Sequence, residues 1–206
     1  MELLTILPGV AAGLGSRARS ASRYALRLVA LWMVFAFSVS TAAENEPLEY
    51  AVKAAYLSKF GLYVEWPRAA FSSPSSALNL CIAGEDPFGA TLDKAVADQR
   101  IGNRAIVVRR LKTVARDSGC HILYVGGSDK RQIRQVIDGV RGTAVLIVSD
   151  GVSPAPAGSI INFVVKDNRV RFDIDDEAAE QNALAVSSKL LSLALNVKRK
   201  PSKESR

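Results

Sequence analysis

Residues 78–84 read Leu-Asn-Leu-Cys-Ile-Ala-Gly, and this stretch decides the fold. Its apolar run is too short for a core helix and is closed by Gly84, so it predicts a buried strand. Residues 88–97 follow, and the spacing of Leu92 and Val96 predicts a helix packed behind that strand. A buried strand followed at once by a helix is the repeating unit of a parallel sheet.

The same alternation continues toward the C-terminus. Strands are predicted at 105–108, 120–125 and 143–148, with a helix at 133–140 between the last two. Near-continuous apolar strands that alternate with helices are typical of sheets covered on both faces. We therefore predict an α/β fold, with a mostly parallel sheet of about five to six strands in a single three-layer domain.

An amphipathic helix is predicted before the first strand. Apolar residues recur there at every fourth position, at Leu48, Val52, Tyr56, Phe60 and Val64. The helix is expected to end at Trp66-Pro67, because the residue before a proline disfavours helical geometry.

The last third of the chain departs from the alternation of strands and helices. Residues 160–165 and 169–174 are strand-like and flank a short polar turn, which predicts an antiparallel hairpin. The second strand alternates apolar residues with charged ones, including Arg169 and Arg171, so one of its faces is expected to be exposed to solvent. Residues 176–197 are predicted to form a long closing helix.

An export leader is predicted over residues 1–43. Four arginines precede the apolar stretch 28–39, and small residues end the segment, which is the order found in secretory signal peptides. Cleavage near Ala43 leaves residues 44–197 as the folded domain and 198–206 as a basic disordered tail. The apolar stretch is shorter than the roughly 20 residues of a bilayer span, but a retained anchor stays the alternative.

Removing the leader changes the charge of the protein. The whole chain carries +7, whereas residues 44–206 hold 23 Lys and Arg against 19 Asp and Glu, and the basic tail accounts for the excess. The neutral body lacks the long-range attraction to phosphate backbones on which nucleic-acid binding depends. We therefore expect no nucleic-acid partner.

Cys81 and Cys120 are the two cysteines of the chain, and an exported protein meets an oxidising compartment. A disulfide between them would close a loop of about 40 residues and add roughly 4 kcal/mol of stability by chain entropy. It would also require the strands at 78–83 and 120–125 to be neighbours, because the bond spans a short distance between Cα atoms. Two separate buried thiols stay the alternative.

Candidate catalytic and metal-binding groups are few. The single histidine, His121, follows Cys120 in a strand pattern, where neighbouring side chains point to opposite faces and do not ligate one metal. We expect His121 to face solvent or to be hydrogen-bonded. Ser187 and Ser188 lack the glycine-flanked elbow of a hydrolase. We predict that the chain is not an enzyme and that it binds no metal or cofactor.

Two glycine-containing turns are candidates for contact with a small ligand or a partner. The first runs from Gly84 to Gly89, where two carboxylates disfavour phosphate and Asp86 is expected to cap the next helix. The second begins at Gly126 and has unobstructed N–H groups, with Ser128 as the expected cap. Both turns follow strands that we predict to be parallel, and open sheets bind ligands at that edge. The candidate contact residues are Asp86, Phe88, Gly126, Ser128, Arg169 and Arg171.

Short motifs along the chain resemble the YfiR family of periplasmic regulators. They lie in the order and spacing of that family over about residues 50–197, at 53–57, 64–67, 81–89, 120–124, 145–150, 161–163, 170–174 and 187–191. The resemblance implies a non-enzymatic protein that binds the periplasmic sensor domain of an inner-membrane diguanylate cyclase and represses it. Cyclic di-GMP and biofilm formation would then fall. It also implies an outer-membrane lipoprotein that sequesters the regulator.

One loop departs from the family pattern. Residues 151–158 contain two prolines and lack the second cysteine pair of some relatives, so control through that loop is not implied here. Two alternatives remain beside the repressor. One is a periplasmic small-molecule sensor with its ligand at the carboxyl ends of the strands, and the other is a periplasmic enzyme of undescribed activity. A homodimer is a further expected partner state.

Overall fold

The computed structural model describes residues 45–151 and 154–199. The predicted leader 1–43 and most of the predicted tail lie outside these residues. In the part of the chain that is described, no helix has both the length and the apolar character needed to cross a membrane.

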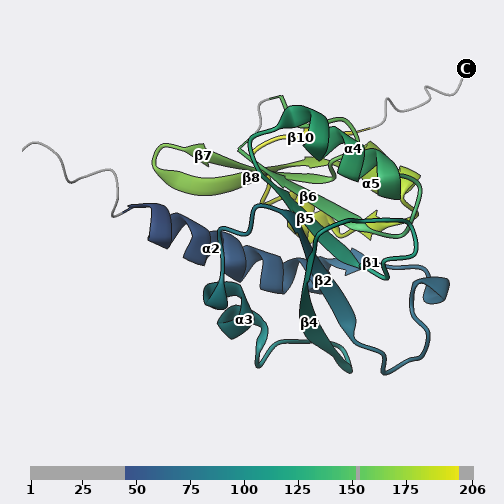
Figure 1. Cartoon of the computed structure of the whole chain (residues 1–206). Coiled ribbons are helices and arrows are strands. Elements are labelled where there is room, and N and C mark those ends of the chain that lie inside the picture. The colour runs from purple at the N-terminus through teal and green to yellow at the C-terminus, as the bar shows by residue number, and fades with distance from the viewer. Residues whose placement is uncertain (1–44, 152–153, 200–206) are drawn as a thin grey trace, which may run out of the picture. The chain divides into compact units, whose positions relative to one another are not determined.

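The main sheet has eight strands in the order β10-β8-β7-β6-β5-β2-β4-β3 (Figure 1). Neighbours from β4 to β7 pair in parallel, whereas β7 with β8 and β3 with β4 pair antiparallel. The bounds are β2 (Leu78–Gly84), β3 (Arg100–Ile101), β4 (Arg104–Leu111), β5 (Ile122–Gly126), β6 (Leu146–Asp150), β7 (Ile161–Lys166), β8 (Arg169–Asp175) and β10 (Val197–Lys198).

The prediction of an α/β fold with a mostly parallel sheet is confirmed, and the predicted hairpin is β7 with β8. Its turn residues Asp167 and Asn168 both have positive φ angles, 51° and 56°, as a two-residue hairpin loop requires. The strand count is higher than predicted. The two additional strands, β3 and β10, lie at the sheet edges and have two residues each, too few to produce a periodic pattern.

Helices cover both faces of the sheet. They are α2 (Asn45–Phe60), α3 (Ala90–Val96), α4 (Lys130–Val140), α5 (Asp176–Gln181) and α6 (Ser188–Leu191). Leu80 and Ile82 of β2 join one core cluster with α2, α3, α5 and α6, while Cys81 and Ala83 join a second cluster with α4. Because successive strand residues point to opposite faces, these two clusters lie on opposite sides of the sheet.

The helix α2 packs on a face that matches the predicted one only in part, since Phe60 and Val64 are buried as predicted but Leu48 and Val52 are not. Ala54, Leu57 and Phe60 are fully buried, whereas Leu48 and Val52 are 65% and 37% exposed. A spacing of four residues advances about 40° around a helix, so residues spaced by four drift away from one face. The helix also ends at Phe60, before the predicted Trp66-Pro67, and a 3-10 turn leads into β1 (Val64–Glu65).

The predicted closing helix at 176–197 is wrong. The segment forms α5, then β9 (Ala185–Val186) paired with β1, then α6 and β10. Ala183 has a φ of 56°, which ends α5, and Ser187 caps α6 by accepting from the N–H of Leu190. Lys198, the first residue of the segment predicted as a tail, belongs to β10.

Cys81 and Cys120 form a disulfide, with their Cα atoms 5.8 Å apart. The pairing of β2 with β5 provides the strand neighbours that this bond requires. Both cysteines are buried in the core cluster beneath α4. The alternative of two separate thiols therefore does not hold in this structure.

His121 joins the loop after β1 to the sheet. Its Nδ1 accepts from the N–H of Asn79 at 3.0 Å, and Nε2 lies 3.0 Å from the carbonyl oxygen of Ala70. Its ring stacks on Phe71 with centroids 4.3 Å apart. Burial lowers the pKa of His121 and the charge of Arg104 lowers it further, which outweighs the opposing bond to Ala70. The expectation of a hydrogen-bonded histidine is confirmed.

We expect the disulfide to contribute about 4 kcal/mol to the free energy of unfolding, because it closes a loop of 39 residues in the unfolded chain. The measurement is denaturant unfolding of the exported protein before and after reduction, with a thiol assay to verify each state. Coincident unfolding curves for the oxidised and reduced protein would contradict this role.

Acid should weaken the fold through His121. Since its folded-state pKa is lowered, the unfolded chain binds the extra proton, and stability is complete above about pH 6.5 but falls as pH decreases below it. His121→Asn should remove the contribution of this histidine to the dependence of the unfolding free energy on pH. The chain has one histidine, so unfolding curves of both proteins at several pH values isolate its effect. Equal slopes would refute the prediction.

Candidate functional site

The candidate site lies at the carboxyl ends of β2, β5 and β6. From β2 the chain passes to β4 on one side, and it then returns to β5 on the other side of β2. The chain leaves β5 for β6 in the opposite direction, so the connections after β2 and after β5 diverge. In open α/β sheets, such a switch point leaves a crevice where ligands bind.

Two glycines shape the crevice. Gly84 and Gly126 are directly paired at the ends of β2 and β5. A Cβ atom on Gly84 would lie 2.2 Å from the carbonyl oxygen of Gly126, and one on Gly126 would lie 2.2 Å from that of Glu85. Because the two backbones approach each other this closely, only glycine fits at either position.

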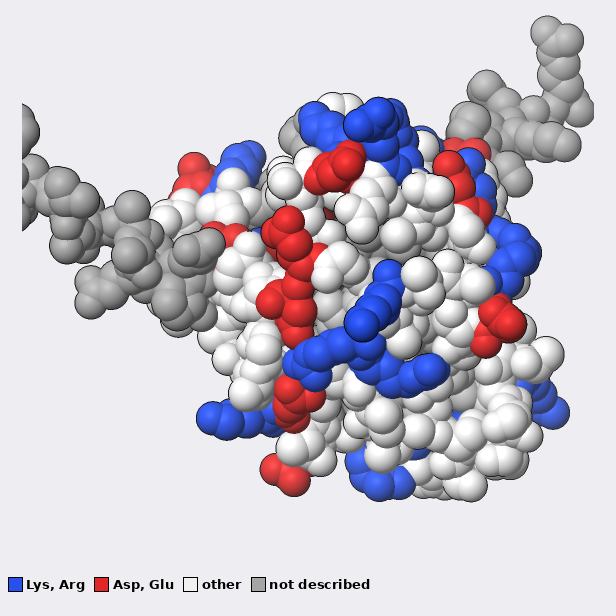
Figure 2. Space-filling view, in the orientation of Figure 1, with Lys and Arg blue, Asp and Glu red and all other residues white. Residues whose placement is uncertain are grey.

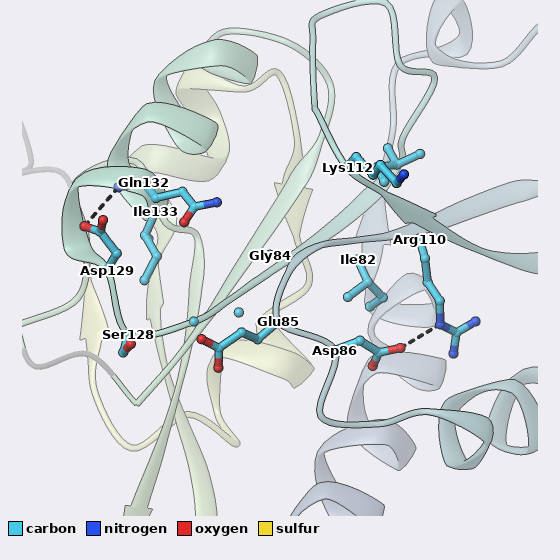
Figure 3. Close-up of a pocket in the computed structure, with 13 residues that line it drawn as sticks. Ile82, Gly84, Glu85, Asp86, Arg110, Lys112, Ser128, Asp129, Gln132 and Ile133 are labelled. Atoms are coloured by element: carbon cyan, nitrogen blue, oxygen red, sulfur yellow. Dashed lines mark hydrogen bonds and ion pairs between the residues drawn. The ribbon is translucent and has the colours of Figure 1, made fainter.

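The first hollow at this edge has a volume of about 560 Å³. In Figure 3, Glu85 lies between Asp86 on one side and Ser128 on the other. Arg110 closes the far side, with its Nε 2.6 Å from Asp86 and its Nη2 2.8 Å from Asp93. The lining of the hollow therefore carries charges of both signs, with Glu85, Asp86 and Asp129 against Arg110 and Lys112.

Capping differs from the prediction in both turns. Asp86 accepts from the N–H groups of Phe88 and Gly89 in the turn before α3, and Gly89 is the N-cap of that helix. Asp129, and not Ser128, caps α4 by accepting from Arg131 and Gln132. A carboxylate one residue further along reaches these donors, so the hydroxyl of Ser128 is left at the hollow's edge.

A second hollow, of about 630 Å³, adjoins the first and shares Glu85, Gly127 and Ser128 with it. Its lining also includes Lys53 of α2, Tyr124 of β5 and Asp150 at the end of β6. The two hollows therefore form one continuous edge site that extends from β4 to α2.

A buried ion pair joins α2 to the sheet in the second hollow. The Nζ of Lys53 lies 2.6 and 2.8 Å from the two carboxylate oxygens of Asp150 and also pairs with Glu49. Tyr124 donates its hydroxyl to Asp150 at 2.9 Å. The side chain of Lys53 is 3% exposed and that of Asp150 is 9% exposed. These partners satisfy charges that would otherwise be costly to bury.

The protonation states of this cluster follow from its contacts. Burial by itself lowers the pKa of Lys53, but hydrogen bonds and charges from Asp150 and Glu49 outweigh burial and raise it. Burial raises the pKa of Tyr124, and the carboxylate of Asp150 raises it further. Lys53 is therefore charged and Tyr124 is a hydrogen-bond donor at neutral pH. Among residues 45–151 and 154–199, no group of three or more potential metal ligands is assembled.

Three of the candidate contact residues are brought together, and three are not. Asp86, Gly126 and Ser128 line the first hollow. Phe88 is 3% exposed and packs edge-on against Tyr124, so its side chain belongs to the core and not to a contact surface. Arg169 and Arg171 lie on β8 and line neither hollow.

Sequence reasoning missed Lys53, Tyr124 and Asp150 as site residues. Lys53 is next to the buried Ala54 on α2, and Asp150 ends a strand whose other residues are all buried. Charged residues at positions expected to be buried require partners, which is the signal that was available. The sequence could not show that Lys53 pairs with Asp150, because the two residues are 97 positions apart.

Charges of both signs are distributed over the surface. On the face shown in Figure 2, a run of acidic side chains lies beside a run of basic side chains. That face therefore has no extended field of one sign, which agrees with the neutral body expected from the sequence.

Asp150→Asn should lower the free energy of unfolding by about 3–5 kcal/mol, because Lys53 would keep its charge with one carboxylate fewer. The matched control is Asp138→Asn, which removes an exposed ion pair with Arg141 and should cost less than about 1 kcal/mol. Urea unfolding at neutral pH measures both.

The wild-type protein and Asp150→Asn should also differ in how much stability they lose at alkaline pH. Because the pKa of Lys53 is raised, its stabilisation is present below about pH 10.4 and is lost as pH rises through the folded-state pKa. The wild-type protein should lose this stability in alkali and Asp150→Asn should lose less of it. Equal losses in both proteins would contradict the assignment.

A family model described as YfiR/HmsC-like matches residues 50–195. The match includes the strands from β2 to β8, both cysteines, Lys53 and Asp150, and the lining of both hollows except Glu49.

Proposed function

The chain belongs to the YfiR/HmsC-like family, and from this premise we propose that it binds the periplasmic sensor domain of an inner-membrane diguanylate cyclase and represses the cyclase. The family is a regulatory one, associated with the periplasm and with diguanylate cyclase signalling. Lower cyclic di-GMP and less biofilm are the expected outcomes. The match over residues 50–195 is the observation that carries the proposal.

Three properties of the chain support this proposal. The bond between Cys81 and Cys120 is consistent with an oxidising compartment. The leader predicted at residues 1–43 would export the chain to that compartment. The neutral body suits a protein partner better than a polyanion.

Repression would operate through the conformational equilibrium of the sensor domain. A regulator that binds the inactive arrangement more tightly than the active one shifts the population toward it. Moving that equilibrium from 1:99 to 99:1 takes about a 10⁴-fold difference in affinity. An outer-membrane lipoprotein that sequesters the regulator would lower its free concentration and release the cyclase, and a homodimer is a further possible state of the free regulator.

Co-purification tests the proposal directly. The full chain with a C-terminal tag is expressed in its own cells, and membranes are solubilised in mild detergent. The expected result is retention of a membrane protein that carries a diguanylate cyclase domain, together with a rise in cellular cyclic di-GMP when the regulator is deleted. Failure to retain any cyclase, with unchanged cyclic di-GMP on deletion, would refute the circuit.

A second candidate function rests on the two adjoining hollows at the switch point. Such a crevice is where sheets of this kind bind small molecules, and a sensor of periplasmic metabolites would use it. A thermal-shift screen tests this candidate, since a ligand at 100 times its Kd stabilises a protein by about 2.7 kcal/mol. Stabilisation that is lost in Ser128→Trp, which fills the shared edge, would favour the sensor.

A further inference from the structure

The helix α2 has apolar residues on both of its faces. The inner face, with Ala54, Leu57 and Phe60, is buried against the sheet. The opposite face carries a second series, which we call the outer stripe: Leu48, Val52, Ala55 and Lys59 on α2 and Leu62 in the 3-10 turn that follows. All five residues are exposed.

The exposure of the outer stripe is unusual for a surface helix. Such a helix needs one apolar face, and its other face is normally polar. Leu48, Val52 and Leu62 are instead 65%, 37% and 51% exposed. The other large exposed apolar residues lie singly, Val107 on β4, Val165 on β7 and Leu193 in the turn after α6, as is ordinary on protein surfaces.

The spacing within the outer stripe indicates what would cover it. Its five residues are separated by four, three, four and three positions. A repeat that averages 3.5 residues is the seam of a helix packed along another helix, and a flat strand or an irregular loop would not match it. Ala55 lies at the centre of the stripe, where a small side chain lets two helices approach closely.

The stripe is held on a rigid support. Lys53 ties α2 to Asp150 of β6, and Tyr56 and Phe60 pack against Phe163 and Phe172 of the hairpin with centroids 5.4 to 6.1 Å apart. A partner would therefore meet a face that needs no reordering, which removes part of the entropic cost of binding.

Charge distinguishes a partner helix from a second copy of this chain. In an antiparallel pairing of two copies about Ala55, each Lys59 would lie near Ala51 and Val52 of the other copy. The stripe itself contains no carboxylate to receive it. No hydrogen bond or ion pair engages the ammonium of Lys59 within the described part of the chain. A carboxylate supplied by a different helix would give a charge-assisted bond in the seam.

We propose that the outer stripe is the docking seam for one helix of a partner protein, a helix with apolar residues at alternating spacings of three and four and a carboxylate opposite Lys59. The inference rests on the proposed function, in which this partner is the periplasmic sensor domain of the cyclase. It adds the surface of contact and the secondary structure that this surface recognises.

Photo-cross-linking in cells tests the seam. The full chain carries p-benzoylphenylalanine at Ala55, and a matched chain carries it at Val165, an exposed apolar site on β7. The expected result is an adduct from Ala55 with the cyclase, mapped by mass spectrometry to a helix of its periplasmic domain, and no such adduct from Val165. Adducts only with a second copy or with lipid, or no adduct while the cyclase still co-purifies, would overturn the seam.

Variants provide a second readout. Ala55→Arg and Lys59→Glu should each weaken binding of the exported protein to the purified sensor domain at least ten-fold, without a change in Tm, while Val165→Arg should bind as wild type. Unchanged binding by both stripe variants, with wild-type binding intact, would reject the seam alone. Absence of binding by the wild-type protein would instead reject the proposed function, and the seam with it.

Discussion

The parallel pairing of β2 with β5 is the contact on which the other features of the domain depend. The register runs from Leu80 opposite Ile122 to Gly84 opposite Gly126. At the amino end of the pair this alignment brings Cys81 within bonding reach of Cys120, and at the carboxyl end it sets two glycines in backbone contact. A slip by one residue would place a side chain where only glycine fits and would turn the alternating residues to the wrong faces.

The sequence predicted those parts of the fold that depend on residues close together in the chain. Apolar runs such as 78–84 identified the buried strands, and the polar turn identified the β7–β8 hairpin. The 176–197 segment failed because its apolar residues serve several short elements, and the left-handed conformation of Ala183 follows from packing and not from residue type. The edge site was predicted in part, since strand ends are visible in sequence, whereas the pairing of Lys53 with Asp150 depends on which helix the fold brings over β6.

The helix α2 connects the two surfaces to which functions are assigned. Glu49 and Lys53 line the second hollow on the inner side, while Leu48 and Val52 belong to the outer stripe on the other side of the same two turns. The ion pair of Lys53 with Asp150 fixes the helix in this position. A ligand that competed for either charge would change the support of the outer stripe, so the sensor and the repressor are compatible functions of one molecule.

Cyclase activity in a purified system is the measurement that tests repression most directly. Full-length cyclase is reconstituted in vesicles with its sensor domain facing outward, and cyclic di-GMP formation from enclosed GTP is followed while the exported protein is added outside. Repression as proposed predicts a saturable fall in the maximal rate, because a regulator that acts on the conformation of the sensor domain would not compete with the substrate. An unchanged rate at concentrations that saturate binding would contradict it.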